Sequence, residues 1–213
     1  MEKVNSTPLL RAEQLTCIKQ DRILFEHLDV AVYPGDIIQV AGPNGAGKTS
    51  LLRILAGLAQ PHEGQVLYNE TPIGADPEQY HQSLLYIGHK AGVKAELSAE
   101  ENLQFSLALH QHDANQAEAL LESVGLLGFE DSLAAQLSAG QHRRISLAQL
   151  WSSHAKVWIL DEPFTAIDVK GVAAIEQQIL SHAQQGGCVI LTTHQPLSLP
   201  ENKVKTLTLK YRV

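Results

Sequence analysis

A glycine-rich segment near residue 45 has the residue types and spacing that bind phosphate. It reads Gly42, Pro43, Asn44, Gly45, Ala46, Gly47, Lys48 and Thr49, and Ser50 follows directly. Glycines permit positive φ angles and let backbone N–H groups approach phosphate oxygens, while the lysine ammonium suits the β- and γ-phosphates. The threonine hydroxyl suits Mg²⁺. The segment therefore predicts a site for a nucleoside triphosphate and its metal ion.

The elements on either side of this loop support the same interpretation. Residues 37–41 form an apolar run typical of a buried strand, and residues 49–58 have the pattern of a helix. Such a helix directs its first N–H groups and the positive end of its dipole at the bound anion. The alternative, a chance glycine-rich turn, does not explain why the loop stands between a strand and a helix.

Two consecutive acids, Asp161 and Glu162, follow the apolar run 157–160. In open α/β sheets ligands bind at the carboxyl ends of the strands, which is where this pair would lie. We expect Asp161 to orient the Mg²⁺ shell and Glu162 to polarise the attacking water as a general base. Acids at the start of a loop are common, so this pair alone would be weak evidence for a catalytic site. The phosphate loop upstream is what favours that interpretation.

A second helix start suited to an anion occurs farther along the chain. Ser138 is a favourable N-cap for a helical pattern that runs to Trp151, and Gly140 and Gln141 lie in its first turn. Three basic residues follow: His142, Arg143 and Arg144. We interpret these three as a solvated or intersubunit basic face rather than as phosphate ligands.

Taken in order, these segments resemble the motifs of ABC transporter ATP-binding subunits. The resemblance rests on the phosphate loop, on 137–141 (LSAGQ) as the signature with Ala139 where glycine is more usual, on the acid pair, and on Asp168 and His194. It implies an α/β fold of the P-loop NTPase class, with a RecA-like core, an antiparallel β subdomain and an α-helical insert. It also implies a single nucleotide-binding domain over residues 1–213, with the insert at approximately 94–152.

The resemblance also implies roles for individual residues. Lys48, Glu162 and His194 would be catalytic, and His194 would contact the γ-phosphate of ATP. The signature residues would bind nucleotide held by a second copy of the chain, and Asp168 would touch that copy's phosphate loop. Because each motif occurs once, two ATP molecules would lie in a symmetric homodimer.

Two positions depart from the general pattern of the family. A glutamine that binds Mg²⁺ and senses the membrane partner normally follows the strand near residues 84–87, and His89 stands at or next to that place. An imidazole can still hydrogen-bond a metal-bound water, but its charge depends on pH. An aromatic ring usually stacks on adenine near the N-terminus, and residues 17–20 contain none. We therefore expect weak base stacking.

The residues around the motifs narrow the resemblance. Segments 86–94, 137–144, 158–171 and 191–197 look like those of the ATP-binding subunits that export haem in bacterial cytochrome c maturation. This implies a peripheral subunit on the cytoplasmic face of the inner membrane, which works with integral membrane permease subunits and, indirectly, with a periplasmic haem chaperone. Two alternatives stay open: an ABC exporter ATPase for another substrate, and a soluble ABC ATPase acting on ribosomes or DNA.

The composition favours a globular protein without a nucleic-acid partner. The 213 residues carry a formal net charge of −7, which argues against a groove for nucleic acid. No apolar run approaches the roughly 18 residues of a membrane-spanning helix. Most of the histidines fit no metal-ligand spacing. We expect them at the surface: His27, His62, His81, His110, His112, His154 and His182.

Hydrophobic patterning predicts the remaining elements. Residues 9–19 and 23–32 predict an antiparallel strand pair, 64–68 and 83–87 short strands, 114–124 a helix, and 204–209 an edge strand. Ser98 and Glu101 have the spacing of a capping box at a helix start.

Overall fold

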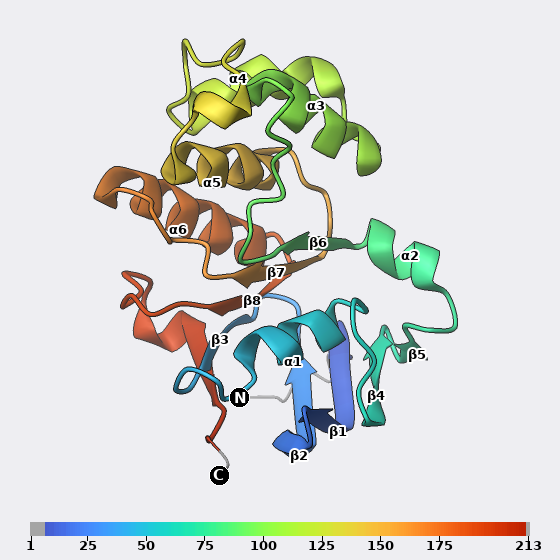
Figure 1. The fold of residues 1–213 in the computed structure, drawn as a ribbon. Coiled ribbons are helices and arrows are strands. Elements are labelled where there is room, and N and C mark those ends of the chain that lie inside the picture. The colour runs from blue at the N-terminus through green and yellow to red at the C-terminus, as the bar shows by residue number, and fades with distance from the viewer. Residues whose placement is uncertain (1–6, 212–213) are drawn as a thin grey trace.

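Two β-sheets and a group of helices make up the part of the chain that the structure describes, residues 7–211 of a computed structural model (Figure 1). One sheet has the order β2-β1-β4-β5 and the other the order β6-β7-β8-β3-β9. Helix α1 lies between the two sheets, α6 covers the opposite face of the second sheet, and α3, α4 and α5 gather beyond α6.

The first sheet is antiparallel and contains the predicted strand pair. Its strands are β1 (Leu10–Lys19), β2 (Arg22–Val32), β4 (Glu63–Tyr68) and β5 (Thr71–Pro72). Gln20 and Asp21 form a two-residue turn with φ of 50° and 60°, the left-handed conformation that tight hairpins use. The pairing of Lys19 with Arg22 confirms the predicted hairpin.

The second sheet is parallel throughout. Its strands are β6 (Leu84–Ile87), β7 (Val157–Asp161), β8 (Cys188–Thr192), β3 (Ile37–Ala41) and β9 (Val204–Thr208). Strands β7 and β8 are buried along their whole length, which explains why they read as continuous apolar runs. Because all neighbours run parallel, the loops after β3, β6, β7 and β8 emerge at one edge.

Two helices cover the faces of this parallel sheet. Helix α1 (Lys48–Leu55) buries Leu51, Leu52 and Leu55 in the core shared with the antiparallel sheet. It is shorter than the predicted helix over 49–58, because Gly57 has a φ of 71° that a helix cannot continue. Helix α6 (Val169–Gln184) packs Ile175 and Ile179 against the other face.

The helical segment has a core of its own, built around Leu103, Leu121 and Ile145. The remaining helices of the chain are α2 (Pro77–Gln82), α3 (Ala99–Leu109), α4 (Ala117–Ser123) and α5 (Ala139–Leu147). Short 3-10 turns occur at η1 (Ala114–Gln116), η2 (Ala134–Gln136), η3 (Ala148–Trp151) and η4 (Glu201–Lys203). The capping box of α3 is confirmed by the Ser98 N–H bond to Glu101 Oε2 at 2.8 Å.

Two predicted helices are shorter than expected in this segment. The pattern over 114–124 begins with the 3-10 turn η1 before α4, and α5 ends at Leu147, where η3 continues the chain to Trp151. Within residues 7–211, no helix has both the length and the apolar character needed to cross a membrane.

Candidate functional site

The phosphate loop joins β3 to α1 and aims the start of that helix into a cavity. Gly47 is the N-cap of α1, with a left-handed φ of 98° and no side-chain cap, so the first N–H groups of the helix are available to an anion. Lys48 Nζ donates to the carbonyl oxygens of Gly42 at 2.7 Å and Pro43 at 3.3 Å. These bonds hold the ammonium over the loop.

Asp161, at the end of β7, has the surroundings of a metal ligand. Its side chain is buried, and Oδ1 accepts a bond from Thr192 Oγ1 at 2.6 Å. Its other oxygen, Oδ2, is buried without a hydrogen-bond partner among residues 7–211. A buried carboxylate oxygen left unpaired is costly, so such atoms normally meet a cation or water. Thr49, the predicted second ligand, lines the same cavity.

Glu162 follows Asp161 in a strained turn, and its side chain lies near His194. Its φ is 52°, an uncommon angle for a residue other than glycine and one that clusters at functional sites. The turn is held by the bond from Glu162 N–H to Thr192 Oγ1 at 2.9 Å. Glu162 Oε1 lies 3.4 Å from His194 Nε2, and the Glu162 side chain is 15% exposed.

A cavity of about 460 Å³ collects most of the predicted phosphate-binding and catalytic residues. Its predicted members are Pro43, Asn44, Gly45, Gly47, Lys48, Thr49, Ser50, His89, Asp161, Glu162 and His194. Lys19, Gln20 and Leu24, from the β1–β2 hairpin, complete the wall. The convergence follows from the parallel sheet, because the loops after β3, β6, β7 and β8 share one edge. The cavity has room for the triphosphate of a nucleotide.

The signature residues lie elsewhere in the chain. Ser138 caps α5 through a capping box, in which Ser138 N–H bonds Gln141 Oε1 at 2.8 Å and Gln141 N–H bonds Ser138 Oγ at 3.3 Å. A Cβ atom at Gly140 would lie 2.5 Å from the carbonyl oxygen of Ala166, so only glycine permits this contact. None of these signature residues lines the phosphate cavity.

Asp168 also lies away from the phosphate cavity. It caps α6, where its Oδ1 accepts from Gly171 N–H at 3.1 Å and from Arg144 Nη2. Within one chain, Asp168 and Arg144 therefore tie the start of α6 to α5. Any contact of Asp168 with a phosphate loop would have to come from a second copy.

The prediction of a solvated basic face is wrong for Arg143. Its side chain is only 3% exposed, and Nη1 bonds the Gly88 carbonyl and Nη2 the Asp161 carbonyl, each at 2.7 Å. Burial lowers the pKa of Arg143, while the carboxylates of Asp161 and Glu162 oppose that shift. Arg143 stands one helical turn before the buried Leu147, so the i, i+4 spacing on α5 was the available signal for its inward position.

His142 and Arg144 also bond within the chain rather than forming a free basic face. His142 Nε2 lies 2.6 Å from the Ala134 carbonyl oxygen, and Arg144 Nη1 donates to the Val124 carbonyl. The three basic residues are thus used to fasten α5 to its surroundings.

Replacement of Arg143 by methionine should lower the kcat for ATP hydrolysis roughly tenfold or more with little change in KM. The reason is that the bonds of a charged donor, each worth about 1.5–3 kcal/mol, hold the loop at Gly88 and the strand end at Asp161 in register. Steady-state kinetics would measure the effect. Arg143→Lys should retain more activity, and a kcat unchanged in the methionine variant would contradict this positioning role.

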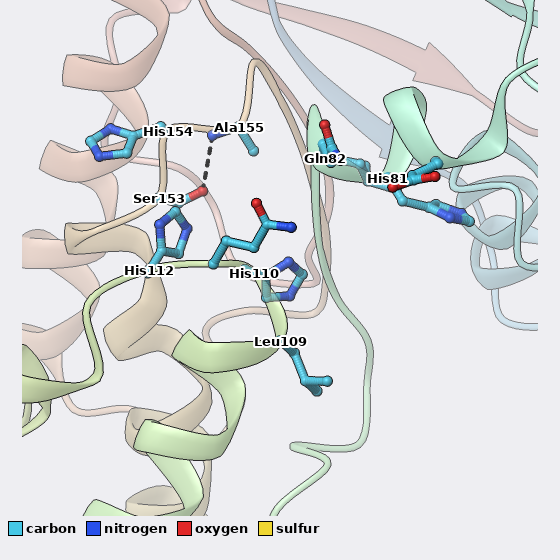
Figure 2. Close-up of a pocket in the computed structure, with 11 residues that line it drawn as sticks. His81, Gln82, Leu109, His110, His112, Ser153, His154 and Ala155 are labelled. Carbon is cyan, nitrogen blue, oxygen red and sulfur yellow. Dashed lines mark hydrogen bonds between the residues drawn. The ribbon is translucent and has the colours of Figure 1, made fainter.

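A larger cavity, about 710 Å³, lies between α2 and the end of α3 and shares no residue with the phosphate cavity. Figure 2 shows the histidines of one wall, with α2 opposite. The rings of His110 and His112 lie 6.3 Å apart, and those of His112 and His154 5.5 Å apart. Burial lowers the pKa of His110 and His112, which favours neutral rings. No group of three or more metal-ligating side chains occurs within residues 7–211.

The histidines are otherwise as expected, except for His112 and His182. Five of the seven are exposed, and His112 and His182 are half-buried. The His182 ring stacks on Trp158 with centroids 3.8 Å apart and planes inclined by 5°. Burial lowers the pKa of His182 to about 4.

The sequence is similar to those of known proteins. Residues 25–165 match the family model for ABC transporters. The "Cytochrome c biogenesis ATP-binding export protein CcmA" of Colwellia psychrerythraea is 57% identical over 212 residues, covering 99% of this chain and 97% of that protein. The proteins of the same description from Shewanella sp. (strain MR-4) and Vibrio cholerae are 55% and 50% identical, over 96% and 94% of this chain and 95% and 98% of theirs.

Solved structures share the fold. A dimeric bacterial ABC transporter cassette, MJ0796, superposes with a TM-score of 0.82 at 21% identity and covers 94% of each chain. A structure described as the ATP-binding subunit of an ABC transporter gives a TM-score of 0.79 at 24% identity, over 87% of this chain and 79% of that one. At these identities the likeness concerns the fold.

Proposed function

Since the chain belongs to the ABC transporter ATP-binding proteins, within the CcmA family of cytochrome c biogenesis export proteins, we propose that its ATP hydrolysis drives haem export or release in cytochrome c maturation. The predicted family and the P-loop fold of the ABC ATPase type are confirmed. The chain is an ATP hydrolase of the ABC type. The cavity in which the phosphate loop, the acid pair and His194 meet supports the ATPase chemistry. The haem part of the proposal rests on the relatives described as cytochrome c biogenesis export proteins.

The proposed chemistry follows from the positions of these side chains. The loop from Gly42 to Ser50 cradles the triphosphate, and Lys48 neutralises its β- and γ-phosphates. Thr49 and Asp161 would hold Mg²⁺, which neutralises charge on the phosphate oxygens; the buried, unpaired Asp161 Oδ2 supports that role.

Glu162 and His194 would act on the γ-phosphate side of the nucleotide. Glu162 accepts a proton from the attacking water, and His194, 3.4 Å from the carboxylate, contacts the γ-phosphate. The strained backbone of Glu162 fixes where this carboxylate points, which suits a group that must meet one water molecule.

A symmetric homodimer completes the proposed site. Ser138, Gly140 and Gln141 lie off the phosphate cavity of their own chain, and the capped start of α5 offers its N–H groups to an anion. A second copy facing the first would bring this helix start to the γ-phosphate and Asp168 to the phosphate loop, in an isologous interface that holds two ATP. In this arrangement residues 1–213 act as one nucleotide-binding domain, with the insert at approximately 94–152.

His89 is the proposed link to the membrane partner. It lines the phosphate cavity, and the carbonyl of the preceding Gly88 is held by Arg143. A movement of this loop would therefore reach both Asp161 and α5. We place the protein peripherally on the cytoplasmic face of the bacterial inner membrane, with permease subunits of the cytochrome c maturation system as direct partners and a periplasmic haem chaperone as an indirect one.

The alternatives differ in partner rather than in nucleotide chemistry. An exporter ATPase for another substrate would have the same phosphate cavity, because the substrate is chosen by the membrane subunits. A soluble ABC ATPase for ribosomes or DNA is disfavoured by the net charge of −7 and by the single copy of each motif.

Capture of the tagged chain from detergent-solubilised membranes tests the proposal. We expect membrane proteins of cytochrome c maturation to copurify, as identified by mass spectrometry, and ribosomes to be absent. Recovery of a different permease would support the exporter alternative, and recovery of ribosomal proteins would support the soluble one.

A further inference from the structure

The nucleotide's base needs a surface outside the loop that holds its phosphates. Residues 17–20, near the N-terminus, contain no aromatic ring. A ring comes instead from the other end of the chain. Strand β9 runs parallel to β3, with Thr208 paired to Ala41 and Leu209 N–H bonded to the Ala41 carbonyl at 2.8 Å. The chain beyond β9 is thereby delivered to the phosphate loop.

The ring delivered there is that of Tyr211. A Cβ atom at Gly45 would lie 3.5 Å from Tyr211 Cε2 and 4.0 Å from Arg22 Nη1, so both side chains stand against the phosphate loop. The Arg22 guanidinium carbon lies 3.9 Å from the centre of the Tyr211 ring. This cation–π contact holds the ring in place from one face.

Tyr211 differs from the other aromatic ring at this loop. Phe25 touches the position of Gly47, with its Cδ1 3.3 Å from a Cβ built there, but Phe25 is 5% exposed and belongs to the core. Tyr211 is 51% exposed, so about half of this residue is accessible to a ligand. Gly45, against which it packs, lines the phosphate cavity together with Lys19 and Gln20 of the hairpin.

We propose that Tyr211, held by Arg22 beside Gly45, is the stacking surface for the purine base of the nucleotide. The inference rests on the proposed nucleotide site and adds the contact that recognises the base. Stacking accepts any base because every base has a π-face. The site should therefore bind ATP and GTP with similar affinity.

The test compares ligands that have a base with one that lacks it. Isothermal titration of the purified full-length chain with Mg²⁺ and the β,γ-imido analogues of ATP and GTP, or inorganic tripolyphosphate, gives three dissociation constants. For Tyr211→Ala we expect roughly 5- to 100-fold weaker binding of both nucleotides, the range for loss of one base–aromatic stack, and unchanged binding of tripolyphosphate. Tyr211→Phe, which keeps the ring, should bind all three as the parent chain does.

Controls separate this inference from the proposed function. Phe129→Ala removes another ring that is 40% exposed but lies outside the phosphate cavity, and it should change none of the three constants. Equal nucleotide binding by Tyr211→Ala and the parent would overturn the stacking role alone, as would an equal loss of tripolyphosphate, which would make Tyr211 a support for the loop. Failure of the parent chain to bind ATP would overturn both.

Discussion

Substitution of Glu162 by glutamine should leave ATP binding intact and lower turnover by roughly 10²–10⁴-fold, the usual contribution of a positioned general base. The amide has the size of the carboxylate but cannot take the proton of the attacking water. Because the bond from Glu162 N–H to Thr192 Oγ1 comes from the backbone, the turn itself should survive the change. ATP hydrolysis by the purified permease complex, with nucleotide binding measured in parallel, separates the two effects.

The same variant should accumulate as an ATP-bound dimer, because bound ATP is no longer consumed. Light scattering of the isolated chain with ATP would detect the doubled mass. Lys48→Ala is the matched comparison: its ammonium sits over the loop, bonded to Gly42 and Pro43 carbonyls, so its loss should weaken both nucleotide binding and transition-state stabilisation. Near-normal hydrolysis by the glutamine variant would remove Glu162 from the role of base.

The sequence could predict that the phosphate loop, the acid pair and His194 lie close together, because a parallel sheet places the loops that follow its strands at one edge. The apolar runs that end near Ala41, Asp161 and Thr192 predict buried strands, and strands that run parallel in one sheet place their carboxyl ends on one edge. The loop after each strand therefore begins at that same edge. The positions of the phosphate loop, the acid pair and His194 at one cavity follow from this rule and not from any detail of packing.

Contacts between residues distant in the chain were not predictable in the same way. Arg143 bonds the carbonyls of Gly88 and Asp161, which lie 55 and 18 positions away, so the contact depends on where the folded chain places α5 beside the ends of β6 and β7. Tyr211 meets Arg22 through the pairing of β9 with β3. The sequence around a single arginine or tyrosine has no local pattern from which such a distant contact could be predicted.

The predicted ends of some helices were wrong for a different reason. The 3-10 turn η3 continues the buried face of α5 with Ala148 and Leu150, so periodicity alone cannot separate it from an α-helix. The 3-10 turn η1 has no buried residue, so it offers no hydrophobic spacing by which its boundary with α4 could be predicted. Where a specific residue ends a helix, as Gly57 does after α1 with its φ of 71°, the boundary has a local cause. Element type was therefore more predictable than element length.

In cells that carry Lys48→Ala or Glu162→Gln as their only copy, cytochromes c should be synthesised but not matured. Both variants stop the ATP cycle at different steps, one at binding and one at hydrolysis, so the loss should not depend on how the cycle is stopped. Haem should accumulate on the periplasmic chaperone or on its membrane loading complex, because the proposed ATP-driven release step is absent. Haem-stained gels of membrane and periplasmic fractions measure both effects.

Cytochromes that bind haem without covalent attachment provide the internal control, and their content should be unchanged. Immunoblots must show each variant at the level of the parent protein, since loss of the subunit would have the same outcome. The prediction rests on relatives described as cytochrome c biogenesis export proteins, 50–57% identical to this chain, together with a phosphate cavity that accounts for ATP hydrolysis but not for the cargo. Normal holo-cytochrome c in both variants would therefore overturn haem export and leave the ATPase itself untouched, because no residue of that cavity selects the cargo.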